Sequence, residues 1–224
     1  MIRVVAIDGP SGSGKSTVAR AVAQRLELEV LDTGAMYRSV TLAALEQGVA
    51  LDDEPGLTAL AERTVIEVGD RVLVDGRDVS AEIRGPEVTS AVSAVSAHHG
   101  VRAVLVDRQR AWAAERGGGV VEGRDIGTVV FPDTPVKVFL TASDTERARR
   151  RALDESAAER DTDVELVAAS MARRDALDSN RTASPLVAAT DAVVVDTTGR
   201  AIDDIVDEIV ACADAAFART GEAD

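Results

Sequence analysis

The sequence predicts an α/β protein in which a parallel sheet is wound with helices and carries two inserts. Short β-branched runs alternate with segments of helical periodicity along the chain, which is the order expected of such a sheet. A glycine-rich loop separates the first strand from the first helix, and two turn dipeptides divide a later stretch into three short strands. Hydrophobic residues make up 46% of the 224-residue chain, so it can build a sizeable core without disulfide or metal.

The first quarter of the chain predicts two strand-and-helix units. Each begins with a short apolar run and continues with apolar residues at helical spacing. A glycine follows the second helical segment, where it is typical of a helix end. The expected elements are a strand at residues 3–7, a helix that contains Val18, Ala21, Val22, Arg25 and Leu26, a strand at 28–31, and a helix at 35–47 ended by Gly48.

Residues 64–79 have the pattern of a small antiparallel meander. The dipeptides Gly69-Asp70 and Asp75-Gly76 separate three short alternating runs, as tight turns between paired strands do. Pro86 then suits a helix start, and the Ala, Val and Ser residues that follow predict one long helix as far as about Trp112. The meander is therefore expected to be an insertion between elements of the main sheet.

The second half of the chain predicts the remaining strands. Apolar runs at residues 120–122, 136–140 and 192–195 are bounded by Gly, Pro or Asp and separated by charged helical segments. The last helix, at about 201–219, has an apolar face. Together these runs give about five parallel strands, with a second, charged insert at about 147–174.

Composition limits the possible partners. Acidic residues outnumber basic residues by 39 to 25, and a formal net charge of -14 opposes binding to nucleic acid or anionic membrane. One Trp, one Tyr and three Phe are too few for a base-stacking platform. The single Cys212 excludes an internal disulfide, and no stretch has the pattern of a signal peptide or membrane span. We therefore expect a cytoplasmic monomer with neither nucleic acid nor membrane partners.

Residues 9–16 match the phosphate-binding P-loop motif GxxxxGK[ST] in full, between a predicted strand and a predicted helix. Glycines allow backbone N–H groups to surround phosphate oxygens, and the helix N-terminus adds a positive end. Lys15 would reach the β and γ phosphates, and the Ser16 hydroxyl would bind Mg²⁺. All but two of the 25 basic residues are arginines, and one of the two lysines occupies the motif position. The sequence thus predicts binding of a nucleoside triphosphate.

Three classes of protein could use this loop. A guanine-dependent switch would need an NKxD segment, yet the chain has one asparagine, Asn180, and Arg181 follows it. A motor ATPase would use its acidic residue to activate water, but here Arg124 stands close after Glu122, which favours a second anion. A small-molecule kinase fits better, because residues 147–181 hold eight arginines that could bring two phosphorylated molecules together. A non-enzymatic nucleotide-binding regulator stays open as an alternative.

Several segments in fixed order carry a family resemblance. They are IDGPSGSGKST at 7–17, LDTGAMYR at 31–38, VSAEIR at 79–84, VRAVLVDRQR at 101–110, EGRDIGTVVFPD at 122–133 and RRDALDSNRTASPL at 173–186. Together they resemble the bacterial cytidylate (CMP) kinases of the nucleoside monophosphate kinase group, nearly end to end. The resemblance implies the three-layer P-loop fold with a five-stranded parallel sheet, an NMP-binding insert with a small antiparallel sheet, and a short helical LID. The implied division is a CORE at 1–35, 100–147 and 172–224, the NMP-binding insert at 36–99 and the LID at 148–171.

The same resemblance implies the activity. It is transfer of the γ-phosphoryl group of ATP, with Mg²⁺, to CMP or dCMP. A UMP/CMP kinase or another small-metabolite kinase is the alternative of the same chemistry. The implied ATP-binding residues are Gly9, Pro10, Ser11, Gly12, Ser13, Gly14, Lys15, Ser16 and Thr17, with Ser16 also as the Mg²⁺ ligand.

The resemblance also implies which residues bind the acceptor and which act in the transfer. Cytosine offers an amine donor and two acceptors, so carboxylate, hydroxyl and cationic side chains suit it. The implied cytosine contacts are Asp125, Ser93 and Arg102, and the ribose contacts are Arg174 and Asp178. Thr33, Arg38, Arg124 and Arg181 would surround the acceptor phosphate, and Lys15, Arg124 and Arg181 would be the catalytic residues.

Overall fold

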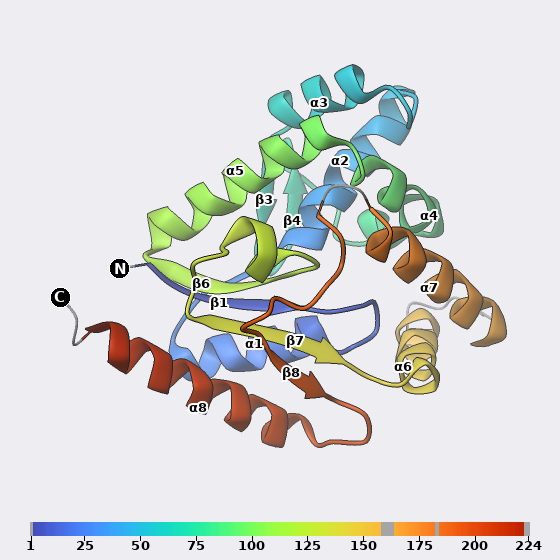
Figure 1. Cartoon of the computed structure of the whole chain (residues 1–224). Helices are drawn as coiled ribbons and strands as arrows, with labels where there is room; N and C mark the ends of the chain where they lie inside the picture. Colours follow the sequence, from blue (N-terminus) through green and yellow to red (C-terminus); the bar gives the residue numbers. More distant parts are fainter. Residues whose placement is uncertain (1, 158–163, 182–183, 222–224) are drawn as a thin grey trace. The chain divides into compact units, whose positions relative to one another are not determined.

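The computed structural model describes residues 2–157, 164–181 and 184–221. The chain folds into two compact units, and Figure 1 shows the helices and strands of each. Unit 1 consists of Met1–Val30 and Gly117–Asp224, and unit 2 consists of Leu31–Arg116. The two units are described in turn.

A five-stranded parallel sheet forms the centre of unit 1, as the sequence predicts. The strand order is β2-β6-β1-β7-β8, and β2 begins at the last residue of the first segment of unit 1. β1 pairs in parallel with β6 and with β7, and β7 pairs in parallel with β8. The strands are β1 at Arg3–Asp8, β2 at Val30–Asp32, β6 at Gly118–Gly123, β7 at Val136–Thr141 and β8 at Val193–Asp196.

The register of the central strand brings two loops to the same edge of the sheet. Asp8, the last residue of β1, is opposite Gly123 of β6 and Phe139 of β7. The carboxyl ends of parallel strands are where α/β proteins bind ligands, because the loops that follow the strands meet there. The P-loop after β1 and the Arg124-Asp125 segment after β6 therefore start next to one another.

Helices α1, at Lys15–Leu26, and α8, at Ile202–Gly221, cover one face of this sheet (Figure 1). Their apolar faces and the strands form a buried cluster of aliphatic side chains, which agrees with the scarcity of aromatic residues. Its members include Val5, Ile7, Val22, Leu140 and Ile209. No helix in the described part of the chain is long and apolar enough to span a membrane.

Two further helices of unit 1 lie beyond the carboxyl end of β7. They are α6, at Asp144–Ala157, and α7, at Val164–Ser179, and they pack against each other (Figure 1). These two helices overlap the charged insert and the expected LID. Residues 158–163 of the expected LID lie outside the described residues. The division into CORE, NMP-binding insert and LID stays a prediction.

Unit 2 contains the antiparallel meander that the sequence predicts. Strands β3, β4 and β5 pair in that order, and the turn between β4 and β5 places Asp75 and Gly76 at positive φ. Helices pack around this small sheet. The elements are α2 at Thr33–Gln47, α3 at Glu54–Arg63, β3 at Ile66–Val68, β4 at Val72–Val74, β5 at Arg77–Asp78, the 3-10 turn η1 at Glu82–Arg84, α4 at Pro86–Val95 and α5 at His99–Arg116.

The long helix expected from Pro86 onward is instead two helices. α4 ends at Val95 and α5 begins at His99. Contacts from the segment around α3 stabilise the start of α5: the Gly100 N–H donates to Glu54 Oε1 at 2.8 Å, and His98 Nε2 lies 2.8 Å from the Leu51 carbonyl oxygen. Sequence reasoning did not predict α3, so the partners that separate α4 from α5 were missed as well.

Candidate functional site

The P-loop joins β1 to α1 in a backbone conformation that only glycine adopts easily. Gly9, Gly12 and Gly14 all have positive φ. A Cβ added at Gly9 would lie 2.1 Å from the carbonyl oxygen of Leu140, so no side chain fits there. α1 begins at Lys15, and its N-terminus therefore faces the loop with its backbone N–H groups.

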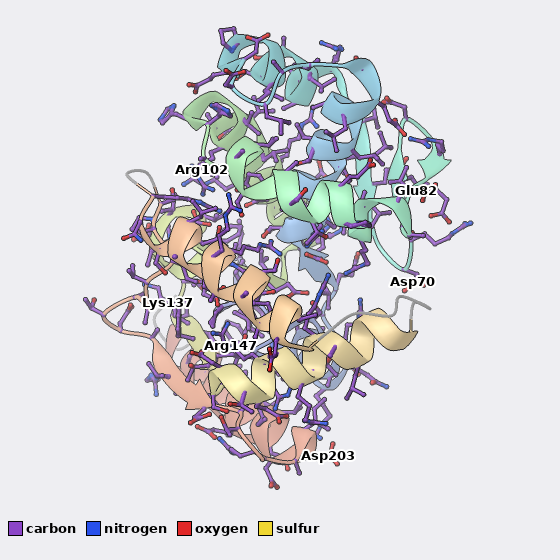
Figure 2. All side chains as sticks on the ribbon, turned by 90° about the vertical axis from the view of Figure 1, so that its right-hand side faces the viewer. Asp70, Glu82, Arg102, Lys137, Arg147 and Asp203 are labelled. Carbon is purple, nitrogen blue, oxygen red and sulfur yellow. The ribbon has the colours of Figure 1, made fainter. Side chains whose placement is uncertain are left out.

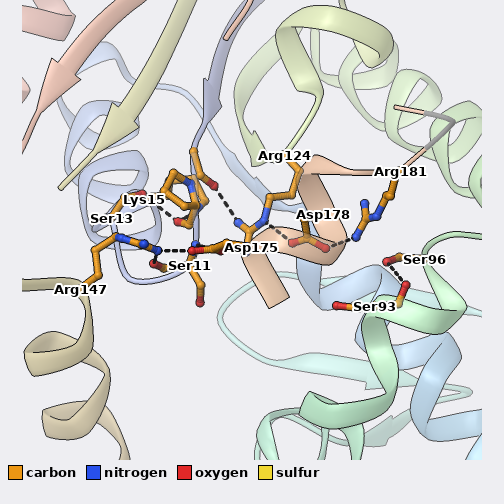
Figure 3. Close-up of polar contacts among 12 residues, drawn as sticks. Ser11, Ser13, Lys15, Ser93, Ser96, Arg124, Arg147, Asp175, Asp178 and Arg181 are labelled. Carbon is orange, nitrogen blue, oxygen red and sulfur yellow. Dashed lines mark hydrogen bonds and ion pairs between the residues drawn. The ribbon is translucent and has the colours of Figure 1, made fainter. Parts of the chain in front are cut away.

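Lys15 is a buried cation held against its own loop. Its Nζ donates to the Pro10 carbonyl oxygen at 2.6 Å, and the Ser13 hydroxyl donates to the same oxygen at 3.0 Å (Figure 3). Burial, with the charge of Arg124 as the next cause, lowers the pKa of Lys15 to about 7. An anion beside Lys15 would stabilise the charged form.

The second lysine is also buried, but it is paired. Lys137 on β7 and Lys15 are each 8% exposed. Lys137 Nζ donates to Asp191 Oδ2 at 2.8 Å and to the Pro132 carbonyl oxygen at 2.5 Å. Lys137 thus stabilises the loops next to β7.

Two oxygen groups lie side by side at the start of α1. The Ser16 hydroxyl donates to Glu122 Oε2 at 3.0 Å, and Glu122 is a buried residue of β6. Mg²⁺ prefers oxygen ligands, and it takes few from the protein because it keeps several waters. A hydroxyl and one carboxylate therefore fit this ion, and among the described residues no three His, Cys, Asp or Glu side chains form a metal cluster. Sequence reasoning assigned Ser16 but not Glu122.

A buried carboxylate connects two arginines that the sequence singles out. Asp178, 1% exposed, accepts from Arg124 Nε at 3.0 Å and also from Arg181 (Figure 3). Burial alone would raise the pKa of Asp178, but the charges of Arg124, Arg181 and Arg174 together lower it. Arg124 Nη1 also donates to the Gly9 carbonyl oxygen at 2.9 Å, which links this group to the P-loop.

Arg174 adds a further positive charge to this group. Burial, followed by the charge of Arg124, lowers the pKa of Arg174 to about 10, and its Nε has no hydrogen-bond partner in the described structure. The charge of Arg174 also contributes to lowering the pKa of Lys15. Lys15, Arg124 and Arg174 form a cluster of cations that repel one another, and this is the electrostatic pattern of an anion site.

Helices α6 and α7 contact the tip of the P-loop. Arg147 lies on α6 (Figure 2). It donates to the Ser11 carbonyl oxygen at 3.0 Å and to Asp175 of α7, and Asp175 Oδ1 accepts from the Ser11 N–H at 3.3 Å (Figure 3). A Cβ at Gly12 would lie 2.8 Å from the Arg147 carbonyl oxygen and from Met171 Cε. The carboxylate of Asp175 thus accepts a hydrogen bond from a backbone N–H group of the P-loop. Sequence reasoning counted Arg147 among the eight arginines of residues 147–181 but did not predict its contact with the P-loop, and it missed Asp175, because their partners are distant in the chain.

Unit 2 holds the other four residues assigned to the acceptor, and all of them are buried. Arg38 on α2 donates to the Ile83 carbonyl oxygen and to the Thr89 hydroxyl, both at 2.9 Å. Arg102 on α5 donates to the Ser96 carbonyl oxygen at 3.4 Å, and its guanidinium carbon lies 5.5 Å from the centre of the Tyr37 ring. Thr33 begins α2, and Ser93 belongs to α4.

Within unit 1, the structure brings the assigned residues into two connected groups. The P-loop, Lys15 and Ser16 form one group, and Arg124, Asp178 and Arg181 form the other. Asp125, which is 4% exposed, follows Arg124 and has the backbone angles φ -145 and ψ 27. The assigned roles of all these residues stay predictions.

Comparison with known proteins identifies the family. The sequence model of the family described as "Cytidylate kinase" matches residues 5–215. The chain belongs to the cytidylate kinase family. A cytidylate kinase of Desulforamulus reducens is 53% identical over 212 residues, covering 93% of this chain and 95% of that protein. One of Mycobacterium avium is 53% identical over 211 residues, covering 92% of each.

A solved structure agrees with the fold. An uncharacterized protein from Eubacterium ventriosum superposes with a TM-score of 0.55 at 13% identity, covering 96% of this chain and 99% of that one. At that identity the similarity concerns the fold alone. Membership of the cytidylate kinase family makes this chain a nucleoside monophosphate kinase that acts on CMP with ATP as donor, which confirms the prediction from sequence. The alternative of a non-enzymatic regulator is not supported.

Proposed function

We propose that Lys15, Arg124 and Arg181 stabilise the phosphoryl group as it passes from ATP to the phosphate of CMP. The observation that carries this proposal is the cluster of like charges at the P-loop, in which burial and Arg124 lower the pKa of both Lys15 and Arg174. Asp178 binds both Arg124 and Arg181 and so joins Arg181 to this cluster. Such a cluster is unfavourable by itself and is stabilised by a bound polyanion. Phosphoryl transfer is catalysed mainly by positioning and by charge stabilisation, which these residues supply.

The transfer needs no general base from the protein. An oxygen of the CMP phosphate attacks the γ-phosphorus of ATP, and the bond from that phosphorus to the oxygen bridging to the β-phosphate breaks. The products are CDP and ADP. Lys15 and the arginines neutralise charge on the transferred group, and the backbone N–H groups of the P-loop orient the donor phosphates.

Ser16 and Glu122 would hold Mg²⁺ together with water. Their oxygens are 3.0 Å apart and are of the type this ion prefers. Mg²⁺ at this position would neutralise part of the charge on the β and γ phosphates. Sequence reasoning proposed Ser16 alone, and its contact with Glu122 supports this carboxylate as a second ligand.

The assignments to the acceptor rest on the family resemblance and on the chemistry of the side chains. Asp125, Ser93 and Arg102 offer the acceptor and donor groups that cytosine requires, and Arg174 and Asp178 are assigned to the ribose. Thr33, Arg38, Arg124 and Arg181 are assigned to the acceptor phosphate. By the same resemblance dCMP is a second acceptor. The acidic net charge of the chain opposes self-association and favours a monomer.

Helices α6 and α7 are proposed to form the LID. The expected LID, residues 148–171, joins the two helices. Arg147 and Asp175 lie in the CORE just outside it, and they attach α6 and α7 to both backbone groups of Ser11. A cover over the P-loop would keep water from the γ-phosphate, so that ATP is not hydrolysed in place of transfer.

A panel of acceptors tests the proposed function. CMP, dCMP, UMP, AMP and GMP are each offered with ATP and Mg²⁺ to the wild-type enzyme and to Asp125→Asn. We expect CMP and dCMP to be the best acceptors. In Asp125→Asn, we expect the ratio of kcat/KM for CMP to kcat/KM for AMP to fall about tenfold, while the KM for ATP stays unchanged. Equal turnover of AMP and CMP by the wild-type enzyme would contradict the assignment, and so would loss of ATP binding in the variant.

A further inference from the structure

Asp8 is a buried acid that none of the assigned roles uses. It is the last residue of β1 and is 5% exposed. Its Oδ1 accepts from the N–H of Ile126 at 2.8 Å, and its Oδ2 accepts from the N–H of Gly127, also at 2.8 Å. The carboxylate thus fixes two successive backbone groups that are 118 and 119 residues away in the chain.

This arrangement requires a carboxylate. Two N–H donors need two acceptor oxygens, and asparagine offers one oxygen while its amide nitrogen is itself a donor. Burial raises the pKa of Asp8 to about 6, although the hydrogen bonds from Gly127 and Ile126 act to lower it. The two hydrogen bonds offset part of the cost of burying the acid, so Asp8 and the two N–H groups hold one another in place.

The segment held by Asp8 directly follows two residues assigned to CMP. Arg124 and Asp125 connect β6 to the helical turn at Ile126–Val130, whose first two N–H groups are the ones that Asp8 binds. Arg124 also binds the residue after Asp8, because its Nη1 donates to the Gly9 carbonyl oxygen at 2.9 Å. The short segment is therefore fixed on both sides by the end of β1.

A second support lies on the other side of the same turn. A Cβ added at Gly127 would lie 3.2 Å from both Cγ and Cδ of Lys137. The stem of Lys137 thus packs directly against Gly127, while Nζ is bound by Asp191. The turn cannot shift toward β7 without moving this buried side chain.

We propose that Asp8 is a positioning residue: it orients Arg124 and Asp125 toward bound CMP, and so contributes to the selectivity for CMP. The proposal rests on the proposed function, which assigns Arg124 and Asp125 to CMP. The competing possibility is that Asp8 orients the P-loop, because Gly9 follows it directly. The two possibilities differ in which substrate is affected when Asp8 is changed.

The experiment compares Asp8→Asn with the wild-type enzyme in steady-state assays that vary ATP and CMP separately. The variant keeps the size of the side chain and leaves one of the two N–H groups without an acceptor. We expect the KM for CMP to rise about tenfold while the KM for ATP changes less than about twofold. An equal rise in both KM values would overturn the proposal in favour of a P-loop role, and an unchanged KM for CMP would also overturn it.

Thr134→Val is the matched control. The Thr134 hydroxyl donates to the Val4 carbonyl oxygen at 2.5 Å, so this change also removes a buried hydrogen bond to β1, but not at Asp8. We expect lower stability with both KM values unchanged. If the control raises the KM for CMP as Asp8→Asn does, the effect is general destabilisation and the proposal is wrong.

Two further variants keep the result decisive. Asp125→Asn is measured in parallel: if it leaves the preference for CMP intact, the proposed function fails, whereas if only Asp8→Asn is without effect, the positioning role fails. Should Asp8→Asn not fold, Gly127→Ala moves the same turn by a few tenths of an ångström against Lys137. We expect Gly127→Ala to raise the KM for CMP about threefold and to leave the KM for ATP unchanged. If the KM for CMP is the same in Gly127→Ala and in the wild-type enzyme, the proposal is overturned.

Discussion

Two regions of unit 1 hold their polar side chains in different ways. At the two ends of β1, Asp8 and Thr134 bond to backbone groups, and the strand itself contributes to a cluster of buried aliphatic side chains. In α6, arginines bond to carboxylates, as Arg149 and Arg150 do to Glu146. The first kind of contact is shielded from water, and the second is partly exposed to it.

This difference shows which contacts should resist changes in salt concentration and which should not. Apolar burial and buried hydrogen bonds are little affected by salt, whereas exposed ion pairs are screened by it and contribute little each. The residues that follow β1 and β6 are thus fixed by the sheet. The contacts of α6 and α7 with the P-loop depend on charges, which bound phosphates can also engage.

Removing a core side chain should separate the two regions most strongly. Leu140 of β7 is fully buried, and Leu153 of α6 is 56% exposed. We expect Leu140→Ala to lower the free energy of unfolding by roughly 2 to 5 kcal/mol, because it leaves a cavity, and Leu153→Ala to change it by less than about 0.5 kcal/mol. Denaturant unfolding measures both. Similar losses in the two variants would show that α6 depends on apolar burial as much as the sheet does.

The next prediction concerns the pH dependence of stability at Asp8. Its pKa in the folded protein is raised to about 6 by burial, from the ordinary value of 3.8. The folded state therefore binds the proton more tightly, so this contribution to stability is present below about pH 4 and is lost as the pH rises through about 6. The stability of the wild-type protein relative to Asp8→Asn should fall by up to about 3 kcal/mol between pH 4 and pH 7.

Unfolding of both proteins by denaturant across this range measures the difference, in which the titrating groups that do not interact with Asp8 cancel. Lys15 does interact with Asp8 and titrates near pH 7, so the comparison is most direct below about pH 6. A difference that stays constant, or that grows with rising pH, would contradict the raised pKa of Asp8. Asn does not titrate, so the hydrogen bond lost in Asp8→Asn lowers stability by the same amount at every pH. Only the change of the difference with pH therefore reports on the pKa of Asp8.

The smallest effect is expected at an exposed ion pair. Arg149 is bound to Glu146 at 2.9 Å, and this hydrogen bond is the first cause that lowers the pKa of Glu146 to about 2. The Arg149 side chain is 60% exposed, and Glu146, although only 19% exposed, keeps its bond to Arg150 when Arg149 is changed. We therefore expect Arg149→Gln to change the melting temperature by less than about 2 °C, and the change should disappear in 1 M salt. Scanning calorimetry at low and high salt measures it. A larger, salt-independent loss would mean that α6 is not held by exposed charges alone.

Sequence reasoning predicted the elements whose signals are local. The glycine-rich motif placed the P-loop between β1 and α1, and Asp75-Gly76 placed the turn of the meander. It failed where a distant residue decides the outcome. At the break before α5, Gly100 contacts Glu54, which lies 46 residues earlier in the chain. The helix that begins at Glu54 was overlooked, although Leu57, Leu60 and Ala61 have helical spacing.

The candidate site divides in the same manner. The P-loop residues follow from one motif, because glycine and lysine are required there by the loop itself. The pairing of Arg124 with Asp178 spans 54 residues, and that of Asp8 with Ile126 spans 118. Neither pairing has a local signal, since an acid at the end of a strand and an arginine in a loop are common. The pairing of β1 with β6 brings Asp8 to Ile126, and the placement of α7 brings Asp178 to Arg124.

The scarcity of lysine has a consequence for chemical labelling. Only an unprotonated amine reacts as a nucleophile, and Lys15, with a pKa of about 7, carries a large unprotonated fraction at neutral pH. Lys137, the other lysine, is bound to a carboxylate. Between the two lysine side chains, an acylating reagent small enough to enter the loop would therefore react first with Lys15, and a nucleotide in the P-loop would protect it.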